Sequence, residues 1–266
     1  MGQVMSDFLH PKIVNHGNGA SMNLLASNSV DLVLTSPPYF SQKTYEALKL
    51  NDLALNRFAD IENDVLKYAR SLRPVFEEIA RVLKKSHPLI IQTKDVRYSG
   101  FLIPLTDAHI SVARTCGFHL VSRIHWSPSK FQAKRIPRFL KTKSVGDFST
   151  FDSEQFLILS DAGGIKRRGK CELSDDVLRK SAQLLWRDQV KRKQNDHPFA
   201  SPRPVIKKLL SLFSEPNDLV VDPFCGFGTI LEEAMKMGRK VSGWEIDKNA
   251  FDEANGRLLS CKGHSH

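Results

Sequence analysis

Short apolar runs alternate along this chain with longer segments in which apolar residues recur every three or four positions. The runs predict buried strands, because they are rich in β-branched residues and bounded by Gly, Pro, Asn or Ser. Strands are expected at residues 13–14, 30–34, 88–92, 118–126, 154–160, 219–221 and 240–244. Helices are expected at residues 62–85, 105–116, 204–213, 229–237 and from 248 onward.

This alternation of strands and helices predicts an α/β fold with a parallel, doubly wound sheet. The chain of 266 residues is long enough for one large α/β domain with a small appendage. Pro74 interrupts the helical pattern of residues 62–85, so that helix is expected in two pieces.

Two loops at predicted strand ends carry candidate chemistry. The strand at 30–34 runs into Thr-Ser-Pro-Pro-Tyr (residues 35–39), and the strand at 219–221 runs into Asp-Pro-Phe-Cys-Gly-Phe-Gly-Thr (residues 222–229). Open α/β sheets bind ligands at the carboxyl ends of their strands. Glycines let the second loop approach a ligand, and the following helix offers free N–H groups. Glu245, at the end of the next strand, is placed to accept hydrogen bonds from ribose hydroxyls, or else simply begins a helix.

The loop at residues 35–39 combines a hydroxyl, proline-directed carbonyls and an aromatic ring. An exocyclic base amine suits this set, because acceptors at its two N–H bonds draw its lone pair out of conjugation while a ring stacks on the flipped base. Read alone, the same residues also fit an ordinary turn, and the glycine loop fits any nucleotide-binding sheet.

The net charge of +10 is concentrated in one part of the chain. Residues 127–196 hold 16 Lys and Arg against 9 Asp and Glu, which predicts contact with nucleic-acid phosphates, or alternatively a solvated basic face. The four cysteines form no CxxC pair, so neither a zinc site, nor any other metal, nor a disulfide framework is expected. No apolar stretch is long enough for a bilayer and no signal peptide is apparent, which predicts a cytoplasmic protein without membrane contact.

Together the two motifs resemble those of the amino-methyltransferases of DNA. The proline loop precedes the glycine loop, which is the circularly permuted order of the β-class enzymes. Residues 12–39 resemble the opening strand, helix and strand of that class, and residues 155–160 its late strand, with Glu154 at the acid. Residues 197–204 (HPFASPRP) resemble the element before the cofactor helix. The resemblance covers nearly the whole chain.

The resemblance implies a mostly parallel, seven-stranded, Rossmann-like methyltransferase sheet, circularly permuted, with a small inserted DNA-recognition region. Residues 1–127 would form the catalytic half, residues 128–196 a basic target-recognition region with one core strand near 154–160, and residues 197–266 the cofactor-binding half. S-adenosyl-L-methionine is the implied methyl donor and double-stranded DNA the implied partner. A homodimer and pairing with a restriction endonuclease are compatible with the class.

Residue roles follow from the same resemblance. Contact with the target base is implied for Ser36, Pro37, Pro38 and Tyr39. Cofactor binding is implied for Asn18, His197, Pro198, Phe199, Asp222, Pro223, Phe224, Gly226, Gly228, Thr229 and Glu245. Backbone phosphates would be held by Lys130, Lys134, Arg135, Arg138, Lys141, Lys143, Lys166, Arg167, Arg168 and Lys170. The chain departs from the family pattern at Asn18, where Asp is usual, and at the bulky Phe227 between the two glycines.

A serine at the head of the proline loop is typical of cytosine-N4 enzymes within this family, which makes N4 of cytosine the expected target. Adenine N6 remains an alternative, as do an RNA or protein-amide methyltransferase and an inactive DNA-binding relative. No cysteine follows a proline, so the Pro-Cys nucleophile of cytosine-C5 enzymes is absent. Trp186 and His197 also fit plain core or capping positions.

Overall fold

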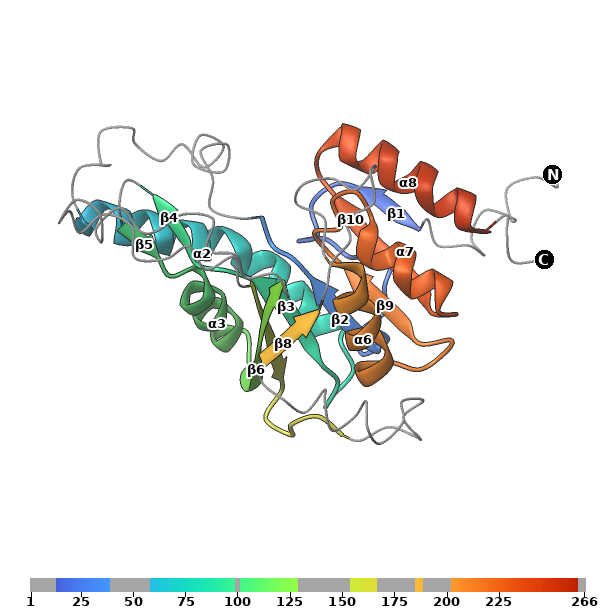
Figure 1. Ribbon diagram of the computed structural model, residues 1–266, viewed down its shortest axis with the longest axis horizontal. Coiled ribbons are helices and arrows are strands. Elements are labelled where there is room, and N and C mark those ends of the chain that lie inside the picture. The colour runs from blue at the N-terminus through green and yellow to red at the C-terminus, as the bar shows by residue number, and fades with distance from the viewer. Residues whose placement is uncertain are drawn as a thin grey trace.

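A single eight-stranded sheet organises the part of the chain that the computed structural model describes, namely residues 13–38, 58–98, 101–128, 154–166, 185–188 and 202–262. Its strands are β1 (Val14–His16), β2 (Leu32–Thr35), β3 (Leu89–Thr93), β6 (His119–Pro128), β7 (Glu154–Ser160), β8 (Leu185–Asp188), β9 (Leu219–Asp222) and β10 (Lys240–Glu245). The helices are α2 (Phe58–Val82), α3 (Leu105–Thr115), α6 (Arg203–Phe213), α7 (Thr229–Lys236) and α8 (Lys248–Lys262). Figure 1 shows their arrangement.

The strand order is β1-β10-β9-β2-β3-β7-β6-β8. β7 alone runs against its neighbours, and the other strands of this sheet point the same way. The expected mostly parallel α/β sheet is therefore confirmed, but it has eight strands rather than the expected seven. β8 is an additional strand that the sequence pattern did not reveal, because it is only four residues long and lies in the basic region. A hairpin of β4 (Val96–Tyr98) and β5 (Phe101–Ile103) was also not expected.

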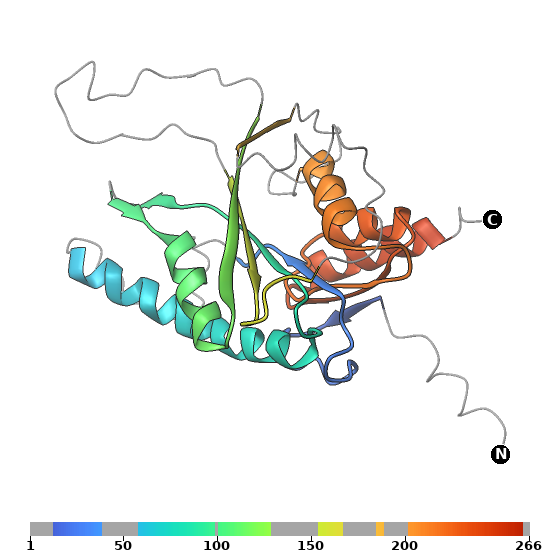
Figure 2. The same cartoon turned by 90° about the horizontal axis from the view of Figure 1, so that it is seen from below.

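Helices cover both faces of the sheet, as Figure 2 shows: α2 and α3 lie on one side, and α6, α7 and α8 on the other. The division follows from side-chain alternation along each strand. On β3, Leu89 and Ile91 join the core beneath α2 and α3, whereas Ile90 joins the core beneath α6. Strands buried on both faces read as continuous apolar runs, which is why the sequence pattern located them.

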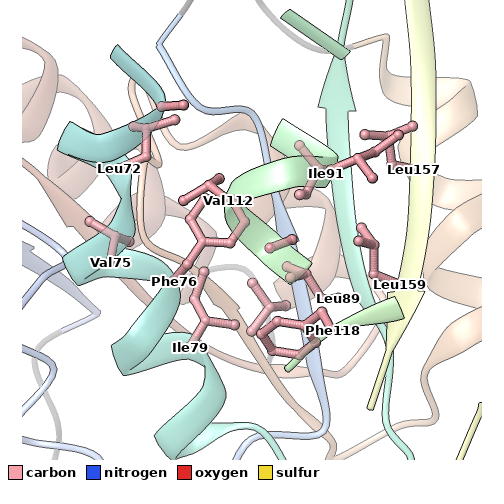
Figure 3. Packing of buried hydrophobic residues seen from close by; sticks show 14 of the residues in the cluster. Leu72, Val75, Phe76, Ile79, Leu89, Ile91, Val112, Phe118, Leu157 and Leu159 are labelled. Carbon is pink, nitrogen blue, oxygen red and sulfur yellow. The ribbon is translucent and has the colours of Figure 1, made fainter. Parts of the chain in front are cut away.

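The larger core lies between α2, α3 and the sheet. Figure 3 shows Phe76 and Ile79 of α2 packed toward Leu89 of β3 and Leu159 of β7. Phe76, Ile79, Leu89 and Leu159 are fully buried. Burial of such side chains contributes about 1.5–3 kcal/mol each relative to exposure. On the opposite face, Trp186 of β8 is a core residue, with Lys208 Nζ 4.3 Å from its ring centroid.

The helix α2 is continuous through Pro74, contrary to the expected break. A proline in a helix interior removes one hydrogen bond and costs roughly 3 kcal/mol. Leu72, Val75, Phe76 and Ile79 on either side of Pro74 are all buried in the same core, so packing across the site outweighs that cost. Among the described segments, no helix is long and apolar enough to cross a membrane.

A partly buried network of ion pairs joins the three helices behind the glycine loop. Arg203, which begins α6, lies 2.9 Å from Glu232 and also pairs with Glu233, both on α7. Arg257 of α8 lies 3.7 Å from Glu232. Burial opposes the charge of Arg203, but its hydrogen bonds to Glu232 and Glu233 outweigh that effect and raise the pKa of the guanidinium. The network therefore fixes α7 between α6 and α8.

Replacing Arg203 tests how much this network contributes to stability. We expect Arg203→Ala to lower the free energy of unfolding by about 3–5 kcal/mol, because Glu233 is left buried without its main partner. Arg73→Ala is the matched control, since it breaks a pair with Glu77 that is about half exposed on both sides and should change stability by less than about 1 kcal/mol. Urea unfolding of both variants gives the comparison, and equal effects would contradict the buried-network interpretation.

Candidate active site at the carboxyl edge of the sheet

Three of the predicted site residues lie at the carboxyl ends of three neighbouring parallel strands, at one edge of the sheet. β2 leads into Ser36, β9 ends at Asp222, and β10 ends at Glu245. β9 lies between β2 and β10, and all three point the same way. The proline loop and the glycine loop, far apart in the sequence, are therefore adjacent at the edge where α/β folds bind their ligands.

A hydrogen bond joins the two loops directly. The Thr35 hydroxyl donates to Asp222 Oδ1 over 2.6 Å, and the same oxygen accepts the backbone N–H of Phe224 at 3.1 Å. Both Thr35 and Asp222 are buried. Burial raises the pKa of the Asp222 carboxyl to about 7; the bonds from Thr35 and Phe224 oppose this rise, and the nearby charge of Glu245 adds to it. Asp222 therefore titrates near neutral pH.

The glycine loop makes a tight turn between β9 and α7. Gly226 and Gly228 have positive φ angles of 51° and 78°, in the left-handed region that favours glycine. Gly228 also packs closely on α8, since a Cβ there would lie 3.1 Å from the Cβ of Ala254. Phe227 between them is half-buried and leaves both turns intact. The departure from a small residue at this position is thus accommodated.

The other residues of this loop are packed into the protein. Pro223 is buried, Phe224 is half-buried against the larger core, and Thr229 is the buried first residue of α7. Arg257 Nη1 lies 3.5 Å from Thr229 Oγ1, which ties the start of α7 to α8.

Glu245 faces the same loop from β10. One of its carboxylate oxygens accepts the N–H of Gly226 at 2.8 Å, and the other accepts the N–H of Asp247 at 2.8 Å. A carboxylate has about four acceptor positions, so Glu245 retains capacity for ligand hydroxyls. It is not merely a helix-initiating acid, because it also holds the glycine loop in place.

The chain after β1 packs against the glycine loop. Asn18 is exposed, and its side-chain oxygen accepts the N–H of Ala20 at 3.0 Å. Gly19 is buried against the glycine loop, because a Cβ at this position would lie 2.8 Å from Pro223 Cβ. Asn18 is thereby placed beside the residues expected to bind the cofactor.

In the proline loop Ser36 is half-buried, Pro37 is buried and Pro38 is exposed. The Pro38 carbonyl accepts a hydrogen bond of 2.6 Å from the hydroxyl of Tyr68 on α2. Within the glycine loop, burial raises the pKa of the Cys225 thiol, so this cysteine remains protonated at neutral pH and is unsuited to act as a nucleophile.

Sequence reasoning missed three residues at this edge. Thr35 links the loops, Tyr68 holds the proline loop, and Ile246 presents an apolar side chain that is 70% exposed directly after Glu245. An apolar residue following the strand-terminal acid was a readable signal for Ile246. Thr35 and Tyr68 gave no comparable signal, because their partners are distant in the sequence.

Several predicted residues lie outside the described part of the chain: Tyr39, His197, Pro198, Phe199, Lys130, Lys134, Arg135, Arg138, Lys141, Lys143, Arg167, Arg168 and Lys170. Lys166 is described and exposed. Its backbone N–H bonds to Ser86 O at 3.2 Å, just before β3 begins, so Lys166 lies at the sheet edge opposite Ser36.

The comparisons with known proteins agree with this geometry. The profile of the DNA methylase family, which groups N6 and N4 methyltransferases, matches residues 30–256. The type II methyltransferase M.BglII of Bacillus subtilis is 30% identical over 89% of this chain and 66% of its own length. The chain belongs to this DNA methylase family.

Solved structures show the same fold. TTHA0409 of Thermus thermophilus, in complex with S-adenosylmethionine, superposes with a TM-score of 0.69 at 23% identity, over 94% of both chains. The cytosine-N4-specific PvuII DNA methyltransferase superposes with a TM-score of 0.70 at 18% identity, over 92% of this chain and 86% of that one. These two structures show that the chain shares their fold, and the family match makes it a DNA methylase.

The raised pKa of Asp222 predicts a pH-dependent stability. Its pKa rises from 3.8 to about 7 on folding, so the folded protein binds more protons between these values and loses stability as the pH increases through them. Each pKa unit corresponds to about 1.4 kcal/mol. We expect Asp222→Asn to be more stable than the parent by a few kcal/mol at pH 8, with this advantage fading toward pH 4.

Urea unfolding without cofactor, from pH 4 to pH 8, measures the difference between the two proteins. Thr35→Val is the companion variant, because losing its hydrogen bond should move the transition in the parent carboxyl to higher pH. A difference between Asp222→Asn and the parent that does not change with pH would refute a carboxyl titrating near 7.

Proposed function

We propose that the protein transfers a methyl group from S-adenosylmethionine to the exocyclic N4 amine of cytosine in a specific double-stranded DNA sequence. The observation that carries the base assignment is Ser36, a neutral hydroxyl rather than a carboxylate or amide, at the head of the proline loop. Through Thr35 this residue adjoins the glycine loop, which begins at Asp222, and this supports a role beside the cofactor.

The residues at the carboxyl edge fit the cofactor. The Glu245 carboxylate suits the ribose hydroxyls, and exposed Ile246 suits one face of the adenine ring. The methionine ammonium group would favour the ionised form of the buried Asp222 carboxyl, and the tight turn at Gly226 and Gly228 allows close approach of the backbone. When bound, S-adenosylmethionine supplies an electrophilic methyl group on a sulfonium.

The protein residues act on the base rather than through a covalent intermediate. The Ser36 hydroxyl and a carbonyl of the proline loop accept the two N–H bonds of the amine and orient its lone pair toward the methyl group. Tyr39 would stack on the flipped base. Serine is too weak a base to remove the proton beforehand, so proton loss follows methyl transfer.

The basic region would hold the DNA backbone. The nine predicted Lys and Arg side chains outside the described residues remain candidates for contact with DNA phosphates. The wider segment 128–196 remains the candidate for target recognition. Lys166 lies at the opposite sheet edge, and we do not place it on phosphates next to the flipped base. The similarity to a type II methyltransferase supports pairing with a restriction endonuclease.

Replacing Ser36 tests the chemistry and the target base together. We expect the parent protein to form N4-methylcytosine in unmethylated DNA, and Ser36→Ala to lower kcat roughly 10–100-fold, as loss of a hydrogen bond to the reacting amine would. Labelled S-adenosylmethionine, digestion to nucleosides and mass spectrometry identify the product. Ser71→Ala, an exposed serine on α2, is the control. N6-methyladenine as the product would overturn the base assignment while retaining the site.

Replacing Glu245 tests the cofactor site. We expect Glu245→Gln to raise the Kd for S-adenosylmethionine at least about tenfold, because the amide replaces one acceptor with a donor facing a backbone N–H. Isothermal titration calorimetry measures the change. Glu253→Gln on α8, whose carboxylate pairs only with Arg257 at 3.1 Å in the described structure, should leave the Kd unchanged. An unaltered Kd in Glu245→Gln would remove Glu245 from the site.

A further inference from the structure

An unbroken series of hydrogen bonds runs from the sheet through two helices to the proline loop. Thr93 Oγ1, at the end of β3, lies 2.9 Å from His109 Nδ1 on α3. His109 Nε2 lies 2.8 Å from the hydroxyl of Tyr68 on α2, and that hydroxyl lies 2.6 Å from the carbonyl oxygen of Pro38. Thr93, His109 and Tyr68 are fully buried.

The Pro38 carbonyl at the end of this series decides which group donates in each hydrogen bond. The Pro38 carbonyl can only accept, so Tyr68 donates its single hydroxyl proton to it. The Tyr68 oxygen must then accept from His109 Nε2–H, and a neutral imidazole with that proton has Nδ1 free to accept from Thr93. Burial lowers the pKa of His109 to about 3, which keeps the ring neutral.

Packing alone does not explain these three residues. Tyr68 belongs to the apolar core beneath α2 and α3, where a phenylalanine would fill nearly the same volume without a buried hydroxyl. Burying polar groups is tolerated when each has a partner, and here every donor has one acceptor and the series ends on the proline loop. Bonds aligned in this way also strengthen one another in a medium of low dielectric constant.

The backbone of Pro38 needs this support. A proline ring fixes φ but leaves ψ free. In Pro38, ψ decides where the carbonyl points and how the chain continues into Tyr39. Because Tyr68 holds the carbonyl oxygen at 2.6 Å, it removes the rotational freedom that the two consecutive prolines leave.

We propose that Tyr68, oriented by His109 and Thr93, is a positioning residue that holds the Pro38 peptide unit of the proline loop in the orientation required for methyl transfer. This inference rests on the proposed function of the loop. Tyr68 touches neither the base nor the cofactor in this role and acts only through the backbone of Pro38.

Tyr68→Phe tests the proposal, because it keeps the ring and deletes the donor. We expect kcat to fall roughly tenfold, while the Kd for S-adenosylmethionine stays within about twofold. Ser160→Ala is the matched control: it deletes a fully buried hydroxyl that donates to Gly164 O at 2.9 Å at the opposite edge. We expect Ser160→Ala to lose about as much stability as Tyr68→Phe, but to show no change in kcat.

His109 supplies a rescue test. His109→Gln retains a side-chain N–H for Tyr68 and an oxygen for Thr93, so it should keep more of the parent kcat than His109→Leu. Equal kcat in the two His109 variants, or parent kcat in Tyr68→Phe, would overturn the proposal.

Spectroscopy separates this proposal from the proposed function. In protein labelled with ¹⁵N and ¹³C, His109 should show the Nε2–H tautomer, and the Pro38 carbonyl signal should shift in Tyr68→Phe but not in Ser160→Ala. Neither readout requires methyl transfer, so both hold even for a protein that methylates no DNA. An Nδ1–H tautomer, or an unmoved Pro38 signal, would show that Tyr68 does not orient this carbonyl.

Discussion

The parallel pairing of β2 with β9 is the contact on which the candidate site depends. Leu32 pairs with Val220 and Val33 with Val221, in the middle of the sheet. That register places the ends of both strands side by side, so Thr35 reaches Asp222 although 187 positions separate them in the sequence. Because side chains alternate along a strand, a slip of one residue would turn Thr35 away from Asp222 and separate the two loops.

The buried polar groups of the site favour positioning over acid–base chemistry. Burial keeps His109 neutral, and Cys225 remains a thiol. The proline loop contributes a hydroxyl and carbonyls, none of which is a strong base. The proposed reaction only has to align an amine with an electrophilic methyl group, which requires rigid acceptors in a region of low dielectric constant, and the proline loop would supply them.

The ion pairs around α7 support the glycine loop. Glu232 and Glu233 project from the first two turns of α7 toward Arg203 of α6, and Arg257 approaches from α8. The glycine loop leads directly into α7, so any displacement of this helix would move Gly226 and the Glu245 carboxylate that bonds to it. Residues remote from the ligand thereby determine how precisely the loop is placed.

The sequence by itself determined the parallel α/β class, most strands and helices, and the two loops, because strand burial, helical periodicity and Pro or Gly turns are local properties. Only the tertiary structure decided the continuity of α2 through Pro74 and the addition of β8, since packing across distant segments outweighs local preference at both. The same is true of the partners of Thr35 and Tyr68. A hydrogen bond between residues far apart in the chain leaves no pattern in the sequence, because strand order and helix packing alone bring its two atoms together.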